Sequence, residues 1–414
     1  MPKPDLARVD ELVKLLDHPE LTYPSIQITG TNGKTTTARA VSALACAHGL
    51  TTGTFVSPHV LSVTERLTVC GAPIPDDEFG DEYERLLPYL GLVDGRVGPV
   101  SYFEALTVLA FMWFADKPVG LGVFEVGMGG SWDATNVVRG DVAVLCPIGL
   151  DHMAVLGGTI EAIATEKAGI VKDGRVAVVR EQPREAMRVI EARAAEVSAR
   201  LVVEDVDFGL EERTRAVGGQ VIRVSGIHAD YEDLGVPIHG EHGARNVAAA
   251  IVACEALLDR ALDPAAVRVA LAELAVPGRV EVVGRRPAVV LDGAHNPEAA
   301  AATAATLLEA FPWQTLHVVI GMFEDKDVEG VAAAFAPLAA RARVIATRPE
   351  GPRAAGVDRV AAAMRDAGFA DVSTAATVAD AVAVAREAAG EDDLILVTGS
   401  FYTVAGARPL FVGA

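Results

Sequence analysis

Short runs of apolar residues alternate with longer stretches of helical period along most of the chain. The apolar runs predict strands at residues 26–28, 54–56, 119–125, 141–147 and 175–179. Such alternation predicts a mostly parallel sheet whose faces are covered by helices. Between Val206 and His239 the pattern changes to charged, glycine-punctuated alternation, which is typical of antiparallel strands appended to the sheet.

A second alternation of strands and helices follows residues 276–279, Val-Pro-Gly-Arg, which interrupt a helical pattern that begins at Ala244. We place a domain boundary there, with domains at residues 1–276 and 277–414. The later strands are predicted at 280–283, 288–291, 316–320, 342–346 and 394–398. The expected fold class is α/β, with a P-loop nucleotide-binding domain and a smaller Rossmann-like C-terminal domain.

Length and composition are those of a multidomain globular enzyme. The chain has 414 residues, 51% of them hydrophobic, and a formal net charge of −20. This charge, without any Lys/Arg block, disfavours long-range attraction to nucleic acid or to an anionic membrane. The longest apolar run, 105–115, is too short to cross a bilayer, and the first residues lack an apolar signal segment. A cytoplasmic monomer is expected.

The cysteines support the same compartment. Cys46, Cys70, Cys146 and Cys254 are widely spaced, with no C-x-x-C pair. The spacing predicts reduced structural thiols in a reducing cytosol, rather than a disulfide framework or a zinc site.

The segment 30–37, Gly-Thr-Asn-Gly-Lys-Thr-Thr-Thr, lies between a predicted strand and a predicted helix. A glycine loop in that position predicts phosphate binding, because backbone N–H groups and the helix N-terminus favour anions. Lys34 is expected to reach the β/γ-phosphate oxygens, and a threonine hydroxyl to meet Mg²⁺. The generic P-loop has a glycine where this chain has Ile28, so the match is to a shorter variant. The alternative is a glycine turn before an ordinary helix.

Two further side chains follow predicted strands. Glu125 comes directly after an apolar run, where parallel sheets place nucleotide and metal sites, although a loop-capping role is the alternative. His152 follows the next strand; Mg²⁺ prefers oxygen ligands, so the residue alone favours an ordinary core or surface role. Lys167 closes a helix that begins near Thr159 and is expected, on position alone, to be a solvated helix lysine.

Two segments combine a cap signal with a possible ligand signal. Ser101 and Glu104 fit a capping box, while Tyr102 and Phe103 offer a stacking surface for a flat heterocycle. The turn 292–297, Asp-Gly-Ala-His-Asn-Pro, predicts a helix cap at Asn296 or His295. Asp, His and Asn together at a strand-to-helix turn also favour a ligand-binding crevice.

Together these segments resemble the Mur ligase family, and within it the folylpolyglutamate synthase/dihydrofolate synthase branch. The resemblance extends from about Ile26 to Val404. Its motifs are G-T-N-G-K at Gly30, S-P-H at Ser57, T-E-R at Thr64, Y-F-E at Tyr102, E-V-G-x-G-G-x-x-D-A-T-N at Glu125, L-D-H at Leu150, E-K-A-G-I at Glu166, P-G-R at Pro277, D-x-A-H-N-P at Asp292, I-G-M-x-x-D-K-D at Ile320 and T-G-S-F at Thr398.

The resemblance implies a role for each site residue. The ATP-binding set is Gly30, Asn32, Gly33, Lys34, Thr35, Thr36, Asn246, Arg279 and Asp292. The metal set is Thr35, Ser57, Glu125 and His152, with Lys167 as a carbamylated lysine at a second metal. The pterin set is Tyr102, Phe103, Glu104 and Trp132, and the glutamate set is His295 and Ser400. Lys34, Asp292 and His295 are the implied catalytic residues.

The implied activity is ATP-dependent addition of L-glutamate to reduced folates, and to dihydropteroate, through an acyl phosphate. Its cofactors are ATP and Mg²⁺, with a monovalent cation such as K⁺ as an optional addition. Two residues depart from the folate branch, because Thr35 stands where glycine is common and Ser131 where arginine is frequent.

Two other functions stay open. A peptidoglycan-precursor amino-acid ligase would normally carry a further N-terminal domain, for which the 29 residues before Gly30 are too few. A P-loop regulator without ligase activity would not need the turn at Asp292.

Overall fold

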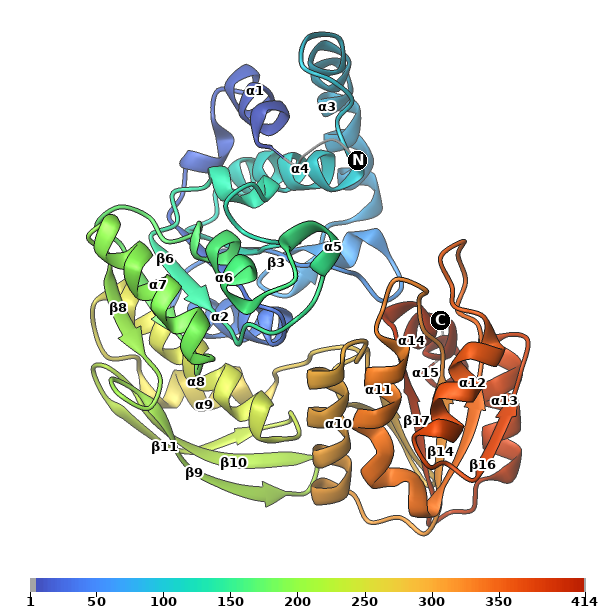
Figure 1. Cartoon of the computed structure of the whole chain (residues 1–414). Coiled ribbons are helices and arrows are strands. Elements are labelled where there is room, and N and C mark those ends of the chain that lie inside the picture. The colour runs from blue at the N-terminus through green and yellow to red at the C-terminus, as the bar shows by residue number, and fades with distance from the viewer. Residues whose placement is uncertain (1–4, 413–414) are drawn as a thin grey trace. The chain divides into compact units, whose positions relative to one another are not determined.

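The computed structural model describes residues 5–412 and contains two compact units. The first unit comprises the chain up to Pro237 together with Gly243–Leu274, and the second comprises Ile238–His242 together with the chain from Ala275. Each unit is built around its own sheet (Figure 1).

The first unit contains an eight-stranded sheet in the order β4-β3-β2-β5-β1-β6-β7-β8. Its strands are β1 (Ser25–Thr29), β2 (Thr52–Phe55), β3 (Leu67–Val69), β4 (Ala72–Pro73), β5 (Leu121–Glu125), β6 (Val142–Leu145), β7 (Val176–Val179) and β8 (Arg200–Val203). In the sheet order from β2 through β5, β1, β6 and β7 to β8, every neighbouring pair is parallel. Strands β3 and β4 add an antiparallel edge beside β2. The five predicted apolar runs are β1, β2, β5, β6 and β7, which confirms the mostly parallel sheet.

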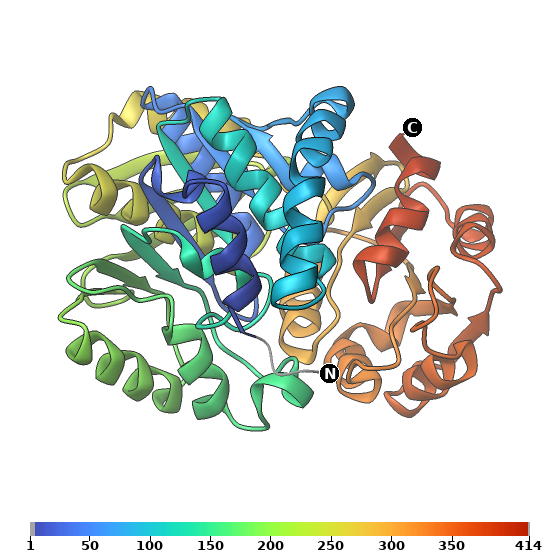
Figure 2. The same ribbon diagram turned by 90° about the horizontal axis from the view of Figure 1, so that it is seen from above.

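Helices cover both faces of this sheet. Phe55, Phe124 and Ala143 lie on the same face of the sheet, because the strand register places them at corresponding positions across β2, β5, β1 and β6. That face packs against α1 (Ala7–Leu15), α3 (Asp76–Arg96), α4 (Tyr102–Asp116), α6 (Ile160–Ala168) and α7 (Arg184–Glu196). Helices α1, α3 and α4 lie side by side in both views (Figures 1 and 2). Helix α2 (Lys34–Ala47) packs against β1, β2 and β5, with α8 (Glu241–Leu258) and α9 (Pro264–Ala272) packed beside it.

The antiparallel strands predicted after Val206 form a three-stranded sheet of their own. They are β9 (Gly209–Ala216), β10 (Gly219–Ser225) and β11 (Asp230–Val236). The buried carboxylate of Glu255 on α8 accepts hydrogen bonds from the Tyr231 hydroxyl and the Ile227 amide, both at 2.8 Å. This sheet is therefore fastened to the helix that also carries Asn246.

The second unit contains a six-stranded sheet in the order β12-β13-β17-β14-β15-β16. Its strands are β12 (Glu281–Arg285), β13 (Ala288–Leu291), β14 (Leu316–Ile320), β15 (Ala342–Ala346), β16 (Asp371–Thr374) and β17 (Leu394–Thr398). Its helices are α10 (Pro297–Ala310), α11 (Val328–Phe335), α12 (Val357–Asp366), α13 (Val378–Ala388), α14 (Phe401–Ala407) and α15 (Pro409–Val412). Only β12 is antiparallel to its neighbour, so a parallel, Rossmann-like sheet is confirmed.

Short helical segments complete the chain. They are α5 (Met153–Leu156) and the 3-10 segments η1 (Pro19–Leu21), η2 (Val63–Arg66), η3 (Ala134–Val137) and η4 (Ala336–Arg341). Within residues 5–412, none of the helices has both the length and the apolar character needed to cross a membrane.

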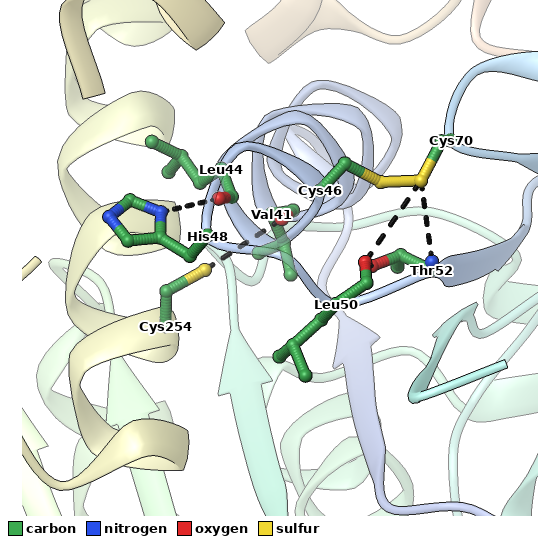
Figure 3. The surroundings of a disulfide bond; sticks show 8 residues. All are labelled: Val41, Leu44, Cys46, His48, Leu50, Thr52, Cys70 and Cys254. Atoms are coloured by element: carbon green, nitrogen blue, oxygen red, sulfur yellow. Dashed lines mark hydrogen bonds between the residues drawn. A yellow bond between two sulfur atoms is a disulfide. The ribbon is translucent and has the colours of Figure 1, made fainter. Parts of the chain in front are cut away.

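Two of the cysteines are bonded to each other. Cys46 near the end of α2 and Cys70 in the turn after β3 form a disulfide (Figure 3). The prediction of four reduced thiols was therefore wrong for this pair. Because β3 runs antiparallel to β2, its end returns to the start of β2 and to the nearby end of α2, and the two Cα atoms lie 5.9 Å apart. Cys146 and Cys254 are free and buried, as predicted.

We expect Cys70→Ser to lower the free energy of unfolding by about 3 kcal/mol, because a cross-link restricts the unfolded chain. The bridged residues are 24 positions apart in the sequence. Urea unfolding of the variant, with and without dithiothreitol, measures the effect. The oxidised wild-type protein should unfold at higher urea than the variant, and reductant should remove that difference. Equal midpoints for the variant and the oxidised wild-type protein would contradict the expectation.

Candidate active site

The phosphate-binding loop connects β1 to α2, and its two glycines have positive φ angles. Gly30 has φ 143° and Gly33 has φ 93°. A Cβ atom on Gly30 would lie 2.6 Å from the Cβ of Cys146, and one on Gly33 would lie 2.6 Å from Oδ1 of Asn246. Both positions therefore require glycine, which lets the loop backbone lie directly against β6 and α8.

Lys34 folds back over this loop from the first turn of α2. Its Nζ donates hydrogen bonds to the carbonyl oxygens of Gly30 at 3.0 Å and Thr31 at 3.1 Å. The Lys34 ammonium group therefore lies beside the N-terminus of the 14-residue helix α2. The ammonium carries a full positive charge and the helix N-terminus a partial one, and both attract phosphate oxygens. Asn32 and Thr36 belong to the same loop and first turn, where Asn32 is half-buried and Thr36 is buried.

Three metal-site candidates meet at the carboxyl ends of β2 and β5. The buried Glu125 accepts a hydrogen bond from the Thr35 hydroxyl at Oε1, 3.1 Å, and from the Ser57 amide at Oε2, 3.2 Å. This carboxylate, with two hydroxyl-bearing residues beside it, is a donor set that fits a hard cation such as Mg²⁺. The residues present therefore fit the expected metal.

His152 lies at the start of α5 and is exposed. Its Nε2 is 3.8 Å from the Asp151 carboxylate. Among residues 5–412, no group of three or more His, Cys, Asp or Glu side chains is placed to hold a metal ion. The candidate metal site therefore consists of Glu125 and its hydroxyl neighbours.

Lys167 is buried, with 4% of its surface exposed, so the expectation of a solvated helix lysine was wrong. Its Nζ donates to the Gly30 carbonyl at 2.9 Å, the same oxygen that Lys34 reaches. Burial, and then the positive charge of Lys34, lower the pKa of Lys167 to about 7. The lowered pKa favours the neutral amine at this position more than at an exposed lysine. The predicted start of this helix near Thr159 is confirmed, and Thr159 is its N-cap, with its hydroxyl accepting from the Ala162 amide.

A hydrogen-bonded loop packs against the end of α6 beside Lys167. Asp133 holds this loop by accepting from the amides of Met128 and Thr135, each at 3.0 Å. Ser131, which stands where the folate branch often has arginine, donates its amide to the Glu166 carbonyl at 2.8 Å and its hydroxyl to the Glu166 carboxylate. Trp132 follows and packs over Gly129.

The capping box predicted at the start of α4 is confirmed. The Ser101 hydroxyl accepts from the Glu104 amide at 3.3 Å, and the Glu104 carboxylate accepts from the Ser101 amide at 2.7 Å. The same carboxylate pairs with Arg8 of α1 at 2.8 Å. Glu104 therefore fastens α1 to α4, in addition to any contact with a substrate.

The two aromatic residues of this segment differ in exposure. Tyr102 is 61% exposed, with the Arg66 guanidinium 5.7 Å from its ring centroid. Phe103 packs against Phe55, with centroids 5.7 Å apart, and against Gly127. Tyr102 is thus the ring that faces solvent, while Phe103 supports the loop after β5.

In the second unit, Asp292 is buried at the end of β13 and anchors the turn. Its carboxylate accepts from the amides of Val280 at 2.9 Å and Ala294 at 3.0 Å, and from the Thr303 hydroxyl at 2.8 Å. The helix cap predicted for this turn is confirmed at Asn296, whose side chain accepts from Ala299 at 2.9 Å.

The ring of Phe401 contacts both Arg279 and His295 in the second unit, and the sequence did not predict this role. The Arg279 guanidinium lies 4.4 Å from its ring centroid, and the His295 ring lies edge-on at 6.5 Å. His295 Nδ1 is 2.8 Å from the Gly293 carbonyl, and since a carbonyl only accepts, Nδ1 carries the proton. Ser400 caps α14 by accepting from Thr403 and donates to the Gly321 carbonyl at 3.0 Å.

Arg180 was also missed. It directly follows β7, and Glu125 likewise stands at the end of β5, so the signal was a charged residue at the end of a buried apolar run. The Arg180 side chain is 4% exposed, and its Nη1 donates to Oδ1 of Asn246. The residue thus lies one contact away from the phosphate-binding loop.

Comparison with known proteins places both units in one family. Residues 28–254 match the Mur ligase middle domain, and residues 278–401 match the Mur ligase glutamate ligase domain. A dihydrofolate synthase/folylpolyglutamate synthase of Mycobacterium tuberculosis is 41% identical to this chain over 440 residues, covering 99% of this chain and 90% of the relative.

Solved structures of the same kind of enzyme also resemble this chain. A Mycobacterium tuberculosis folylpolyglutamate synthase complexed with ADP and AMPPCP has a TM-score of 0.94 and 40% identity, covering 99% of this chain and 96% of that one. A bifunctional folylpolyglutamate synthase/dihydrofolate synthase with Mn, AMPPNP and L-glutamate bound has a TM-score of 0.86 and 30% identity, covering 99% of this chain and 95% of that one. The chain therefore belongs to the Mur ligase family, in its folylpolyglutamate synthase/dihydrofolate synthase branch, as the motifs predicted.

Proposed function

We propose that this protein is an ATP-dependent ligase that joins L-glutamate to reduced folates, and also to dihydropteroate. The observation that carries the proposal is the phosphate-binding loop with Lys34, Glu125 and Lys167 around it, in a chain that matches a dihydrofolate synthase/folylpolyglutamate synthase over 99% of its length. The glycine-turn and P-loop-regulator alternatives do not account for a second unit that matches a glutamate ligase domain.

The first unit supplies the phosphate-binding loop and the metal ligands in this proposal. Loop amides from Gly30 to Thr36, with Lys34, bind the phosphates of ATP. Thr35, Ser57 and Glu125 hold Mg²⁺, which supplies charge neutralisation on the transferring phosphate when bound. Asn246, Arg279 and Asp292 are assigned to ATP, and His152 and a carbamylated Lys167 to the metals, by the family resemblance.

The chemistry needs no protein nucleophile. A substrate carboxylate oxygen attacks the γ-phosphorus, the bond to the β–γ bridging oxygen breaks, and ADP leaves with an acyl phosphate formed. The glutamate amine then attacks the acyl carbon, loses a proton, and phosphate leaves as the amide forms. Lys34 and the loop amides stabilise negative charge on the transferring oxygens, and positioning supplies the remaining catalysis.

The acceptor and pterin sides are assigned to separate residues. His295 and Ser400 are assigned to the incoming glutamate by the family resemblance, and the hydrogen bond from His295 Nδ1 to the Gly293 carbonyl fixes the orientation of its ring. Tyr102 and Trp132 are assigned to the pterin ring, supported by Phe103. A flat ring stacked there could take either of two registers, which is the basis for two ligations at one site.

The remaining properties are proposed with this activity. Small-molecule substrates suffice, and we propose a monomer that acts in the cytoplasm without nucleic acid or a membrane. The location follows from the folate chemistry and not from the cysteines, since Cys46 and Cys70 are bonded.

ADP release tests the function. Purified protein is incubated with ATP, Mg²⁺ and either dihydropteroate or tetrahydrofolate, with and without L-glutamate, and the products are identified by mass. A nucleotide-linked muramyl peptide serves as the competing substrate. The proposal expects glutamate-dependent ADP release and a glutamylated product with both pteridines. Product from only one pteridine would restrict the activity to that ligation, and product only from the muramyl peptide would overturn the folate assignment.

A further inference from the structure

A buried charged network lies behind the phosphate-binding loop. Arg180 and Glu204 are both buried, and Arg180 Nε donates to Glu204 Oε2 at 2.8 Å. The Glu181 amide donates to the same oxygen at 2.7 Å, and Arg245 Nη1 donates to Glu204 Oε1 at 3.2 Å. Removing two charged groups from water is costly, so the network would be expected to serve more than stability.

The network ends at Asn246. Arg180 Nη1 donates to Oδ1 of Asn246, and because a guanidinium has donors only, the orientation of the amide is unambiguous. The amide lies against Gly33, whose added Cβ would meet Oδ1 at 2.6 Å and Nδ2 at 3.2 Å. With Oδ1 held by Arg180, Nδ2 is the group that the side chain offers to a ligand acceptor beside the loop.

We propose that Arg180 is a positioning residue for the nucleotide: it locks the Asn246 amide with its donor toward the nucleotide, and Glu204 holds Arg180 in place. The inference rests on the proposed ATP site but not on the identity of the folate substrate. Arg245 shares Glu204 with Arg180 and sits next to Asn246 in the sequence, yet the guanidinium of Arg180 makes the contact with the amide. Arg245 therefore provides a matched control.

Binding of AMPPCP, measured by calorimetry, tests the inference without any ligation. Arg180→Gln and Asn246→Ala should each weaken binding about 10-fold, since a hydrogen bond to a charged group is lost or a donor is removed. The double variant should bind no more weakly than the weaker single variant, because both changes remove one contact. Arg245→Gln should bind within about 2-fold of wild type, because its guanidinium pairs with Glu204 and with the exposed Asp205. In turnover, KM for ATP should rise and KM for glutamate should not.

Arg180→Lys covers the case in which Arg180→Gln fails to fold, because lysine keeps the charge beside Glu204 but loses the second arm that reaches Asn246. It should melt near the wild-type temperature and still bind AMPPCP more weakly. Wild-type binding by a folded Arg180→Lys or Arg180→Gln variant, or fully additive losses in the double variant, would overturn the positioning role. Failure of the wild-type protein itself to bind AMPPCP would instead refute the ATP site.

Discussion

Replacing Lys34 with alanine should lower turnover by about 100-fold or more, which corresponds to about 3 kcal/mol of lost transition-state stabilisation. Lys34 is the only lysine of the loop, and its Nζ lies over the loop carbonyls of Gly30 and Thr31. Its charge is therefore placed where negative charge builds on the transferring oxygens. Steady-state ADP release by the purified variant measures the effect.

The control for this variant is Lys117→Ala, which removes an exposed ammonium that pairs with Glu78. It should keep wild-type turnover, because exposed ion pairs contribute little. Thermal unfolding of Lys34→Ala should stay close to wild type, since its two hydrogen bonds to loop carbonyls are replaced by water. A well-folded Lys34→Ala protein with near-wild-type turnover would refute the phosphate role.

Replacing Lys167 with glutamine should also lower turnover by about 100-fold or more, and by more than its effect on stability would explain. The family resemblance implies a carbamate here. A neutral amine attacks CO₂, the N–C bond forms and the amine proton is released, which converts a cation into an oxygen ligand. The buried position and the pKa lowered to about 7 are consistent with that reaction.

Lys172 supplies a matched control for the carbamate. It is half-buried, and partial burial and then the charge of Arg193 lower its pKa to about 8; its Nζ donates to the Asn136 carbonyl and side chain, both at 2.8 Å. With ¹³C-bicarbonate, a carbamate resonance should appear in wild type and in Lys172→Gln but not in Lys167→Gln. Turnover should fall when CO₂ is stripped. A bare ammonium at Lys167 during turnover would contradict the carbamate.

Much of the fold is predictable because the central strands are buried on both faces. Strands β1, β5 and β6 read as continuous apolar runs for that reason. Strand β16 was missed because it is a four-residue edge strand with three exposed positions, so neither periodicity nor apolar content marks it. Strand β8 is also a four-residue edge strand, and its short apolar run of three residues was too brief to be recognised. The β3–β4 edge was missed similarly, and with it the return of Cys70 to Cys46.

The site was predictable where chemistry is local in sequence, as in the phosphate-binding loop and the Ser101 capping box. It was not predictable where distant segments decide it. Lys167 is buried because the loop around Ser131 covers the end of its helix, 35 residues away in sequence. Arg180 reaches Asn246 across 66 residues. Such contacts follow from strand order, which the apolar pattern does not specify.

Transfer of an oxygen atom tests the central claim, an acyl-phosphate ligase, most directly. A reduced folate labelled with ¹⁸O in its glutamate carboxylates is incubated with the protein, ATP, Mg²⁺ and L-glutamate, and the released phosphate is analysed by mass spectrometry. Attack of that carboxylate on the γ-phosphate predicts one ¹⁸O atom in each phosphate, with one new amide formed per ADP. Unlabelled phosphate released alongside the ligated product would contradict the account, because the carboxylate would not have been phosphorylated.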